Sequence, residues 1–244
     1  MTALDHPHLG VLAFGDSITN GGGELQLGVA LRSWALWTAR GLGLPYTGYA
    51  VDGAGVTNVL GVQIPAFRAR AADPDGHYDL GCLYVGVNDV RWPEWDASTF
   101  AAGHAAALAF LRERCARVVC LTPPVDLGRP RARGDRVAAL CDVIRGNAAA
   151  REALVVSLAD FGARNHVMVD RVHPTAFGQV AIAQRVLRAL AADGMDVRVD
   201  PARLIAPGGR TRWNALKGDW TYLYRDLKQR AREIAVRGTE AFAR

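Results

Sequence analysis

The sequence lacks the patterns that mark several large classes of protein. It has no basic N-terminal segment followed by an apolar one, no apolar run of about 18 residues and no internal repeat. These absences argue against a secretory signal, a transmembrane helix and a repeat protein. We therefore expect a cytoplasmic protein. Its 244 residues, of which 50% are hydrophobic, are enough to bury a substantial core.

Cysteine is also scarce. The four cysteines, Cys82, Cys115, Cys120 and Cys141, form no C-x-x-C pair, and two of them lie within apolar, strand-like runs. We expect buried, reduced thiols rather than a disulfide or metal framework. The sequence has no H-E-x-x-H motif and no Cys/His pairing at zinc spacing, so neither a metal nor another cofactor is implied.

Excess positive charge is confined to the C-terminal part of the chain. Residues 1–193 hold 18 Lys and Arg against 18 Asp and Glu, whereas residues 194–244 hold 11 against 6, which accounts for the whole formal charge of +5. A neutral body argues against nucleic-acid binding. We therefore divide the chain into a main domain over residues 1–193 and a basic extension over residues 194–244.

The extension contains a candidate amphipathic helix. Apolar residues recur there with the helical spacing of three and four, at Trp213, Leu216, Trp220, Leu223, Leu227 and Ile234. Basic residues fall mostly on the other faces of such a helix. We expect the apolar face to pack on the body or on a second subunit, as in a homodimer. Contact with a membrane surface is the alternative, because aromatic and basic side chains occur together.

Short apolar runs alternate with helix-like stretches through the main domain. Strands are predicted over residues 9–14, 46–51, 80–85, 118–121 and 154–157, and helices over residues 29–42, 59–71, 100–114, 134–150 and 177–192. Continuous apolar strands separated by helices are typical of a parallel sheet that is covered on both faces. With right-handed crossovers, this pattern predicts an α/β protein, a three-layer α/β/α sandwich around a five-stranded sheet.

Glycine and polar residues follow most of the predicted strands. The segments are Gly15-Asp16-Ser17, Asp52-Gly53-Ala54-Gly55, Gly86-Val87-Asn88-Asp89 and, beyond the last strand, Asp170-Arg171-Val172-His173-Pro174. Functional residues of a parallel sheet gather at the carboxyl ends of its strands. We therefore expect these four segments to meet at one rim of the sheet.

The residues of this rim suit nucleophilic catalysis. The hydroxyl of Ser17 needs a base to accept its proton, and the imidazole of His173 is suited to that role. Asp170, three residues earlier, can hold the imidazole and stabilise its charged form. Asp16 lies beside the serine and cannot easily reach the far side of the imidazole, so we expect it to support the turn.

An oxyanion that forms in such a reaction needs N–H donors already in place. The backbone amide of Ser17, the backbone amide of Gly53 and the side-chain amide of Asn88 are the candidates. A glycine suits this purpose because no side chain blocks the approach to its amide.

The segments G-D-S-I-T-N-G, the glycine at 53, G-V-N-D and D-R-V-H-P resemble, in this order, the four sequence blocks of the SGNH/GDSL hydrolase family. The resemblance covers residues 9–192. It implies a flavodoxin-like sheet and serine esterase or lipase chemistry. Carried over to this sequence, it implies Ser17 as nucleophile and oxyanion donor, His173 as base, Asp170 as the orienting acid, and Gly53 and Asn88 as further donors.

The second block departs from the family's pattern. The family often has asparagine two residues before its glycine, whereas this chain has valine at that position. Gly55 therefore stays open as an alternative to Gly53 as the oxyanion donor.

The expected function is hydrolysis of a carboxylic ester, an acyl or acetyl ester of a small molecule, sugar or lipid, through an acyl-enzyme on Ser17. An acyltransferase that passes the same acyl group to an alcohol or amine is one alternative, and a non-catalytic binding module on the same fold is another. Two tryptophans after the third block, Trp92 and Trp95, either line a substrate pocket or cover the next helix.

A glycine run at residues 21–23 suggests a phosphate-binding loop at first sight. A P-loop also needs lysine followed by serine or threonine, which this stretch lacks, and no G-x-G-x-x-G motif occurs. We interpret these glycines as extra, unconstrained length in the loop beside the nucleophile.

Overall fold

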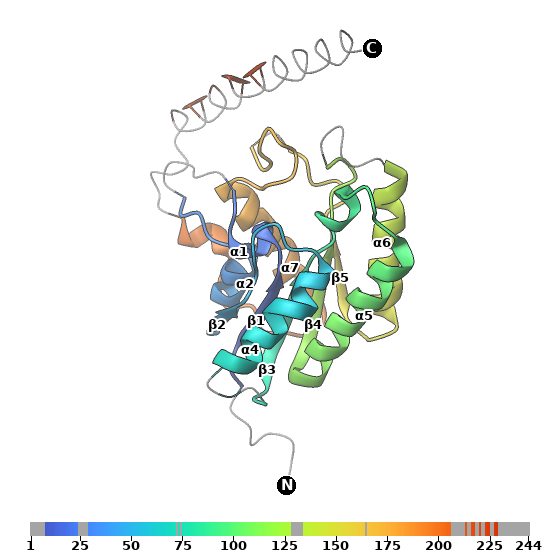
Figure 1. Ribbon diagram of the computed structural model, residues 1–244. Helices are drawn as coiled ribbons and strands as arrows, with labels where there is room; N and C mark the ends of the chain where they lie inside the picture. The colour runs from blue at the N-terminus through green and yellow to red at the C-terminus, as the bar shows by residue number, and fades with distance from the viewer. Residues whose placement is uncertain are drawn as a thin grey trace.

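The centre of the molecule is a five-stranded sheet in which every strand pairing is parallel. The strand order is β2-β1-β3-β4-β5, as in flavodoxin-like proteins, and helices cover both faces (Figure 1). The predicted three-layer α/β/α class is therefore confirmed. The computed structural model describes residues 8–23, 29–71, 73, 75–127, 134–163 and 165–205, and eight further positions, Trp213, Leu216, Lys217, Trp220, Leu223, Tyr224, Leu227 and Lys228.

The strands follow the apolar runs of the sequence. They are β1 (Val11–Gly15), β2 (Tyr46–Gly48), β3 (Tyr78–Tyr84), β4 (Cys115–Thr122) and β5 (Leu154–Ser157). All five residues of β1 are buried, because this strand pairs with β2 on one side and β3 on the other. Its carboxyl end consequently lies between those of β2 and β3 at the rim of the sheet, which is where the Gly15-Asp16-Ser17 segment begins.

The helices form two layers. They are α1 (Ser17–Asn20), α2 (Trp34–Leu42), α3 (Val56–Asn58), α4 (Ile64–Arg70), α5 (Ala97–Arg114), α6 (Gly134–Ala149) and α7 (Ala176–Ala192), with a π-helix η1 (Val59–Gln63) and 3-10 turns η2 (Asp89–Arg91) and η3 (Pro201–Leu204). Helices α2 and α7 pack against each other, and α5 packs against α6. Right-handed crossovers place the first pair and the second pair on opposite faces of the sheet.

One predicted helix begins later than the sequence pattern indicated, and another is not a regular α-helix along its whole length. The helix predicted from residue 29 begins at Trp34, because the Ser33 hydroxyl accepts a hydrogen bond from the amide of Leu36 at 3.1 Å and caps the helix there. The stretch predicted as a helix from residue 59 begins as a π-helix before Pro65. Proline lacks the N–H group of a helix interior, and a π-turn is one way in which a chain accommodates it.

Large aromatic side chains fill the core on both faces of the sheet. Phe14 of β1 contacts Phe67 of α4 and Phe110 of α5 edge to face, with ring centroids 6.1 and 5.9 Å apart. Trp34 and Trp37 of α2 are fully buried on the other face. All four cysteines are buried and free, as predicted.

The eight described positions of the extension beyond residue 205 are helical. Their apolar side chains are between 45% and 73% exposed, so the body does not cover this face. A second subunit and a membrane surface are the predicted alternatives that are left. Within the described part of the chain, no helix is both long enough and apolar enough to span a bilayer.

Candidate active site

Ser17 is the first residue of α1 and lies directly beyond the end of β1. The turn between them depends on Gly15, whose φ is +155° and which has no space for a Cβ next to the carbonyl oxygen of Tyr84. The Asp16 carboxylate then accepts a hydrogen bond from the amide of Ile18 at 2.9 Å and starts the helix. The Ser17 amide belongs to the first turn of that helix, whose N–H groups have no partner within the helix.

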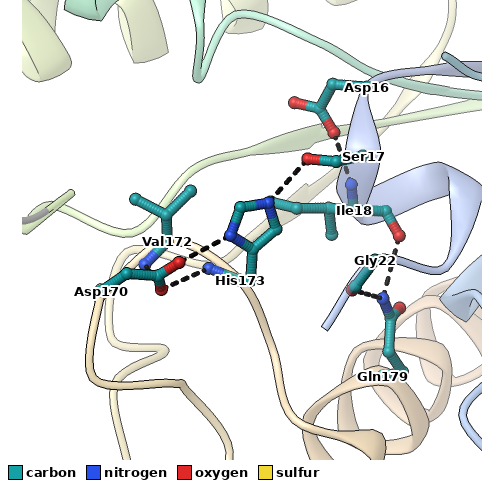
Figure 2. A network of polar contacts seen from close by, with 8 residues as sticks. All are labelled: Asp16, Ser17, Ile18, Gly22, Asp170, Val172, His173 and Gln179. Carbon is teal, nitrogen blue, oxygen red and sulfur yellow. Dashed lines mark hydrogen bonds and ion pairs between the residues drawn. The ribbon is translucent and has the colours of Figure 1, made fainter. Parts of the chain in front are cut away.

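Ser17, His173 and Asp170 form a hydrogen-bonded chain (Figure 2). Ser17 Oγ lies 2.8 Å from His173 Nε2, and His173 Nδ1 lies 2.7 Å from Asp170 Oδ2. Ser17 comes from the end of β1, and the other two residues come from the loop before α7. The structure thus brings together three residues that the sequence separates by 156 positions.

The loop that carries Asp170 and His173 is held by its own backbone. Asp170 Oδ1 accepts hydrogen bonds from the amides of Val172 at 2.9 Å and His173 at 3.0 Å, so both carboxylate oxygens are used. Arg171 adopts a φ of +57°, which closes this tight turn. Thr175 then caps α7 by accepting a hydrogen bond from the amide of Gly178. The imidazole is therefore fixed relative to both Asp170 and the following helix.

The pKa values of this pair move in opposite directions. The hydrogen bond to Asp170 raises the pKa of His173, and this effect outweighs burial, which lowers it. Burial alone raises the pKa of Asp170, but hydrogen bonds from the His173 ring and from two backbone amides outweigh burial and lower it. Asp170 is thus a carboxylate at neutral pH, and it favours the imidazolium form of His173 that a base catalyst must reach.

Asp16 is buried beside Ser17 and caps the turn, and it is not a member of the hydrogen-bonded chain Ser17–His173–Asp170 (Figure 2). Burial raises its pKa to about 7, against the effects of the Ile18 amide and of His173, which lower it. Its Oδ2 has no hydrogen-bond partner among the described residues. The structure therefore places Asp16 as a support of the turn, as predicted, and as a charge near His173.

We expect Asp16→Asn to shift the acid limb of the pH–activity profile to lower pH. The ionised form of Asp16 raises the pKa of His173, so its removal lowers that pKa and the neutral base becomes available at lower pH. Asparagine can still accept the hydrogen bond from Ile18. The measurement is kcat/KM for a soluble ester against pH. Asp142→Asn, on the exposed surface of α6, is the matched control and should leave the limb in place.

The turn after β2 is hydrogen-bonded on one side to the segment around Ser17 and on the other side to Asn88. Asn20 of α1 donates from its side-chain amide to Asp52 at 2.9 Å, and the amide of Val51 donates to the Gly15 carbonyl at 3.1 Å. On the other side, the Asn88 side-chain nitrogen donates to the carbonyl of Ala54 at 3.0 Å. That bond uses one of the two N–H groups of the Asn88 amide and leaves the second for another acceptor.

The two candidate glycines of this turn differ in their surroundings. Gly53 is exposed, has a φ of +74° and has open space where a side chain would lie. Gly55 is buried, and its Cα lies against the Asp89 carboxylate and the Trp92 ring. Gly53 is thus the exposed one of the two glycines. The geometry favours Gly53 as the donor, and the assignment stays a prediction.

The two tryptophans after the third motif have different environments. Trp92 is 44% exposed and lies beside Gly55, so its ring is available at the rim. Trp95 is partly buried and packs against the core. This environment matches the alternative in which Trp95 is a covering residue and not part of a substrate pocket. Arg136 of α6 donates to the carbonyl of Trp92 at 3.2 Å and holds this loop. A pocket-wall role stays a prediction for Trp92.

A buried glutamine that the motifs did not reveal, Gln179 of α7, connects α7 to the nucleophile turn. Its side-chain nitrogen donates to the carbonyls of Ile18 at 2.9 Å and Gly22 at 3.0 Å (Figure 2). Its side-chain oxygen accepts from the amide of Trp34 at 2.7 Å. The amide of Gly22 in turn donates to the Ser17 carbonyl at 2.6 Å. Gly22 is thus hydrogen-bonded through both its carbonyl and its amide. The interpretation of residues 21–23 as extra, unconstrained length in the loop is therefore wrong at Gly22.

A second buried glutamine, Gln63, holds the other side of the turn. It ends the π-helix η1, and its side chain exchanges two hydrogen bonds with the backbone of Gly15, at 3.0 Å to the amide and 2.8 Å to the carbonyl. It thereby pairs with the last residue of β1 as a neighbouring strand would. A polar residue with apolar neighbours in a helical pattern was the only signal for either glutamine in the sequence.

We expect Gln179→Leu to destabilise the protein and to lower kcat. The substitution removes three hydrogen bonds to the backbone, two of them buried, which costs about 3 kcal/mol of unfolding free energy in total. The change reaches Ser17 through Ile18 and Gly22, so kcat should fall about tenfold. Gln184→Leu on the surface of α7 is the matched control and should change stability by less than about 0.5 kcal/mol. Denaturant unfolding and ester hydrolysis measure both effects, and equal behaviour of the two variants would contradict the assignment.

A cavity of about 430 Å³ lies on the far side of the loop that carries Asp170. Met168 and Arg171 of that loop contribute to its lining, together with Phe161 after β5, whereas Ser17 and His173 do not. It is therefore separate from the hydrogen-bonded chain. Among the residues that the structure describes, no three His, Cys, Asp or Glu side chains are grouped so that they could hold a metal ion.

Comparison with known proteins connects this geometry to a family. Residues 13–181 match the model of the GDSL-like lipase/acylhydrolase family, which is more than half of the chain. The match includes the nucleophile turn, the turn after β2, the third motif and the Asp170–His173 loop. No curated protein matches the sequence significantly.

Solved structures share the fold at low sequence identity. A lipase/acylhydrolase from Enterococcus faecalis is 18% identical with a TM-score of 0.59, and the match covers 78% of this chain and 98% of that one. A member of the lipolytic G-D-S-L family from Veillonella parvula is 20% identical with a TM-score of 0.59, over 75% and 98% of the two chains. The acetylxylan esterase Axe2 from Geobacillus stearothermophilus is 17% identical with a TM-score of 0.56, over 74% and 93%.

Proposed function

Because the chain belongs to the GDSL-like lipase/acylhydrolase family, we propose that it hydrolyses carboxylic esters through an acyl-enzyme on Ser17. The observation that carries this proposal is the chain of two hydrogen bonds from Ser17 Oγ to His173 Nε2, at 2.8 Å, and from His173 Nδ1 to Asp170 Oδ2, at 2.7 Å. A nucleophile, a base and an orienting acid are thus already in contact, in the order that acyl transfer requires.

The first half of the reaction forms the acyl-enzyme. His173 Nε2 accepts the Ser17 proton while Oγ bonds to the ester carbonyl carbon, and Asp170 stabilises the imidazolium that results. The carbonyl oxygen becomes an oxyanion, for which the amides of Ser17 and Gly53 and the second side-chain N–H of Asn88 are the proposed donors. His173 then returns the proton to the alkoxide oxygen, the C–O bond breaks and the alcohol leaves.

The second half regenerates the enzyme. His173 removes a proton from water, the resulting hydroxide attacks the acyl carbon, and the same donors stabilise the second oxyanion. Collapse of this intermediate returns the proton from His173 to Ser17 Oγ and releases the carboxylic acid. An alcohol or amine in place of water would give the acyltransferase reaction through the same intermediate.

The spacing of the acid and the base supports these roles. Three of the similar structures are catalytic mutants of Axe2, in which a serine, an aspartate or a histidine is replaced by alanine, and the aspartate stands three positions before the histidine. Asp170 and His173 have the same spacing in this chain. This likeness supports a triad of Ser17, His173 and Asp170.

The proposed substrate class is a carboxylic ester of a small molecule, a sugar or a lipid. Rates on p-nitrophenyl esters of rising acyl length, measured beside acetylated sugars, test this proposal. We expect turnover of at least one group, and its dependence on acyl length then identifies the substrate class. Product analysis with added alcohols and amines separates hydrolysis from acyl transfer. No turnover of any ester or acyl donor would contradict the proposal.

A further inference from the structure

The main domain buries Ile205 of the extension but does not cover the apolar side chains that the structure describes beyond that residue. Eight described residues, here called the extension face, are helical, and they are Trp213, Leu216, Lys217, Trp220, Leu223, Tyr224, Leu227 and Lys228. The two tryptophans are 64% and 73% exposed, and the three leucines are 45–60% exposed. Exposed apolar groups at this density on one side of a helix mark a surface that binds something.

The residues of the extension face are sorted by type. At about 100° per residue the eight positions fall within an arc of about 140°. Leu223, Leu216 and Leu227 occupy one edge of that arc, and the three aromatic residues occupy its middle. Lys217 and Lys228 occupy the other edge. The face therefore grades from aliphatic through aromatic to cationic side chains.

The two lysines are unusual for this protein. The chain has 29 Lys and Arg residues, and its only two lysines are Lys217 and Lys228. They lie about three helical turns apart on the same edge, and the Lys217 ammonium group is 5.4 Å from the centre of the Trp213 ring. Lysine can keep its aliphatic stem on an apolar surface while its ammonium group reaches a polar one.

The body offers no matching apolar surface in its described part. The other exposed large hydrophobic residues there are Val51, Val62, Trp92, Val125 and Leu204, which belong to different loops and elements. Single exposed residues of this kind are normal and form no groove for a helix. The described part of the body therefore offers no groove for the extension face, which points to an occupant outside it.

The order of side chains favours a lipid surface over a second copy. In a two-stranded coiled coil, Trp213, Trp220 and Leu227 would occupy the a positions, where branched aliphatic residues pack best and an indole ring is too large. At a bilayer surface, tryptophan and tyrosine prefer the level of the headgroups, with aliphatic residues deeper and lysines near anionic groups. The extension also carries the whole net charge of +5, which complements an anionic surface.

We propose that the extension face binds the surface of an anionic phospholipid bilayer, with its helix lying in the plane of the headgroups. The leucines and aromatic rings enter the boundary between headgroups and acyl chains, and Lys217 and Lys228 contact the anionic headgroups. The catalytic domain is thereby held at the membrane surface. The inference rests on the exposed face alone and does not depend on the proposed ester hydrolysis.

Sedimentation of the full chain with lipid vesicles tests the proposal. We expect the protein to pellet with vesicles that contain phosphatidylserine, to pellet much less with pure phosphatidylcholine, and to be released by raised salt. Lys217→Glu/Lys228→Glu should weaken binding to the anionic vesicles at least about 25-fold, because each lysine near such a surface contributes about a fivefold increase in affinity. Trp220→Ser/Leu223→Ser should also abolish pelleting.

The control is Arg70→Glu/Arg188→Glu, which makes the same change of net charge on exposed parts of α4 and α7. It should pellet like the parent, and circular dichroism and thermal unfolding check that every variant is folded. Three results would overturn the proposal. They are equal or absent pelleting with the two kinds of vesicle, equal loss in the control, and a lipid-free dimer that Trp220→Ser/Leu223→Ser dissociates, which would assign the face to a second copy.

Discussion

Replacement of Ser17 by alanine is expected to lower kcat for ester hydrolysis by a factor on the order of 10⁵ or more. The change removes the atom that attacks the ester, and no neighbouring hydroxyl is held against His173 among the described residues. Stability should change little, because the one hydrogen bond that is lost, from Oγ to His173 Nε2, is partly exposed and contributes about 1 kcal/mol.

The matched control for this variant is Ser98→Ala at the start of α5. The Ser98 hydroxyl donates to Asp96 on the surface, so its removal should leave kcat unchanged. Steady-state kinetics on one soluble ester and urea unfolding of both variants separate a catalytic effect from a folding effect. Ser17→Ala with more than about a tenth of parental kcat would show that another group is the nucleophile.

Replacement of Asp170 by asparagine is expected to lower kcat on the order of 10⁴-fold. The amide cannot stabilise the imidazolium, and its NH₂ group favours the ring form that donates from Nε2 rather than accepts there. The pH dependence should change as well. Because the hydrogen bond to Asp170 is the largest cause that raises the pKa of His173, its loss moves the acid limb of the residual activity to lower pH.

Asp160→Asn provides the matched control for Asp170. Asp160 pairs with Arg185 on the surface, and its substitution should change neither kcat nor the pH profile. The comparison is made on kcat/KM between pH 5 and 9, about the range in which histidine titrates. If Asp170→Asn retained parental activity, His173 would need no orienting carboxylate. That result would contradict the role that the proposed mechanism gives to Asp170.

The sequence was sufficient to predict the sheet and the motifs at its rim because both depend on local patterns. Buried parallel strands have continuous apolar runs, such as residues 118–121, and the loops after them gather in space whatever the details of packing. Asp170 and His173 could be paired for the same reason, since three residues separate them within one loop. The distant Ser17 then followed from the topology.

The residues that the sequence did not reveal act through tertiary contacts. Gln63 and Gln179 are polar residues among apolar neighbours in helices, and their partners at Gly15, Ile18 and Gly22 are brought to them only by the folded chain. The expectation that the body covers the apolar residues of the extension had a similar origin. Periodicity identifies an apolar face, but it does not say what lies opposite.

The most direct test of the account is the site of covalent labelling by a fluorophosphonate probe, which reacts with activated serines. The account predicts one adduct per chain, on the peptide that contains Ser17, with no adduct in Ser17→Ala and a much slower reaction in Asp170→Asn. Mass spectrometry of the intact and digested protein measures all three. An adduct on another residue, or no adduct in a preparation that turns over esters, would contradict the assignment of Ser17 as the nucleophile.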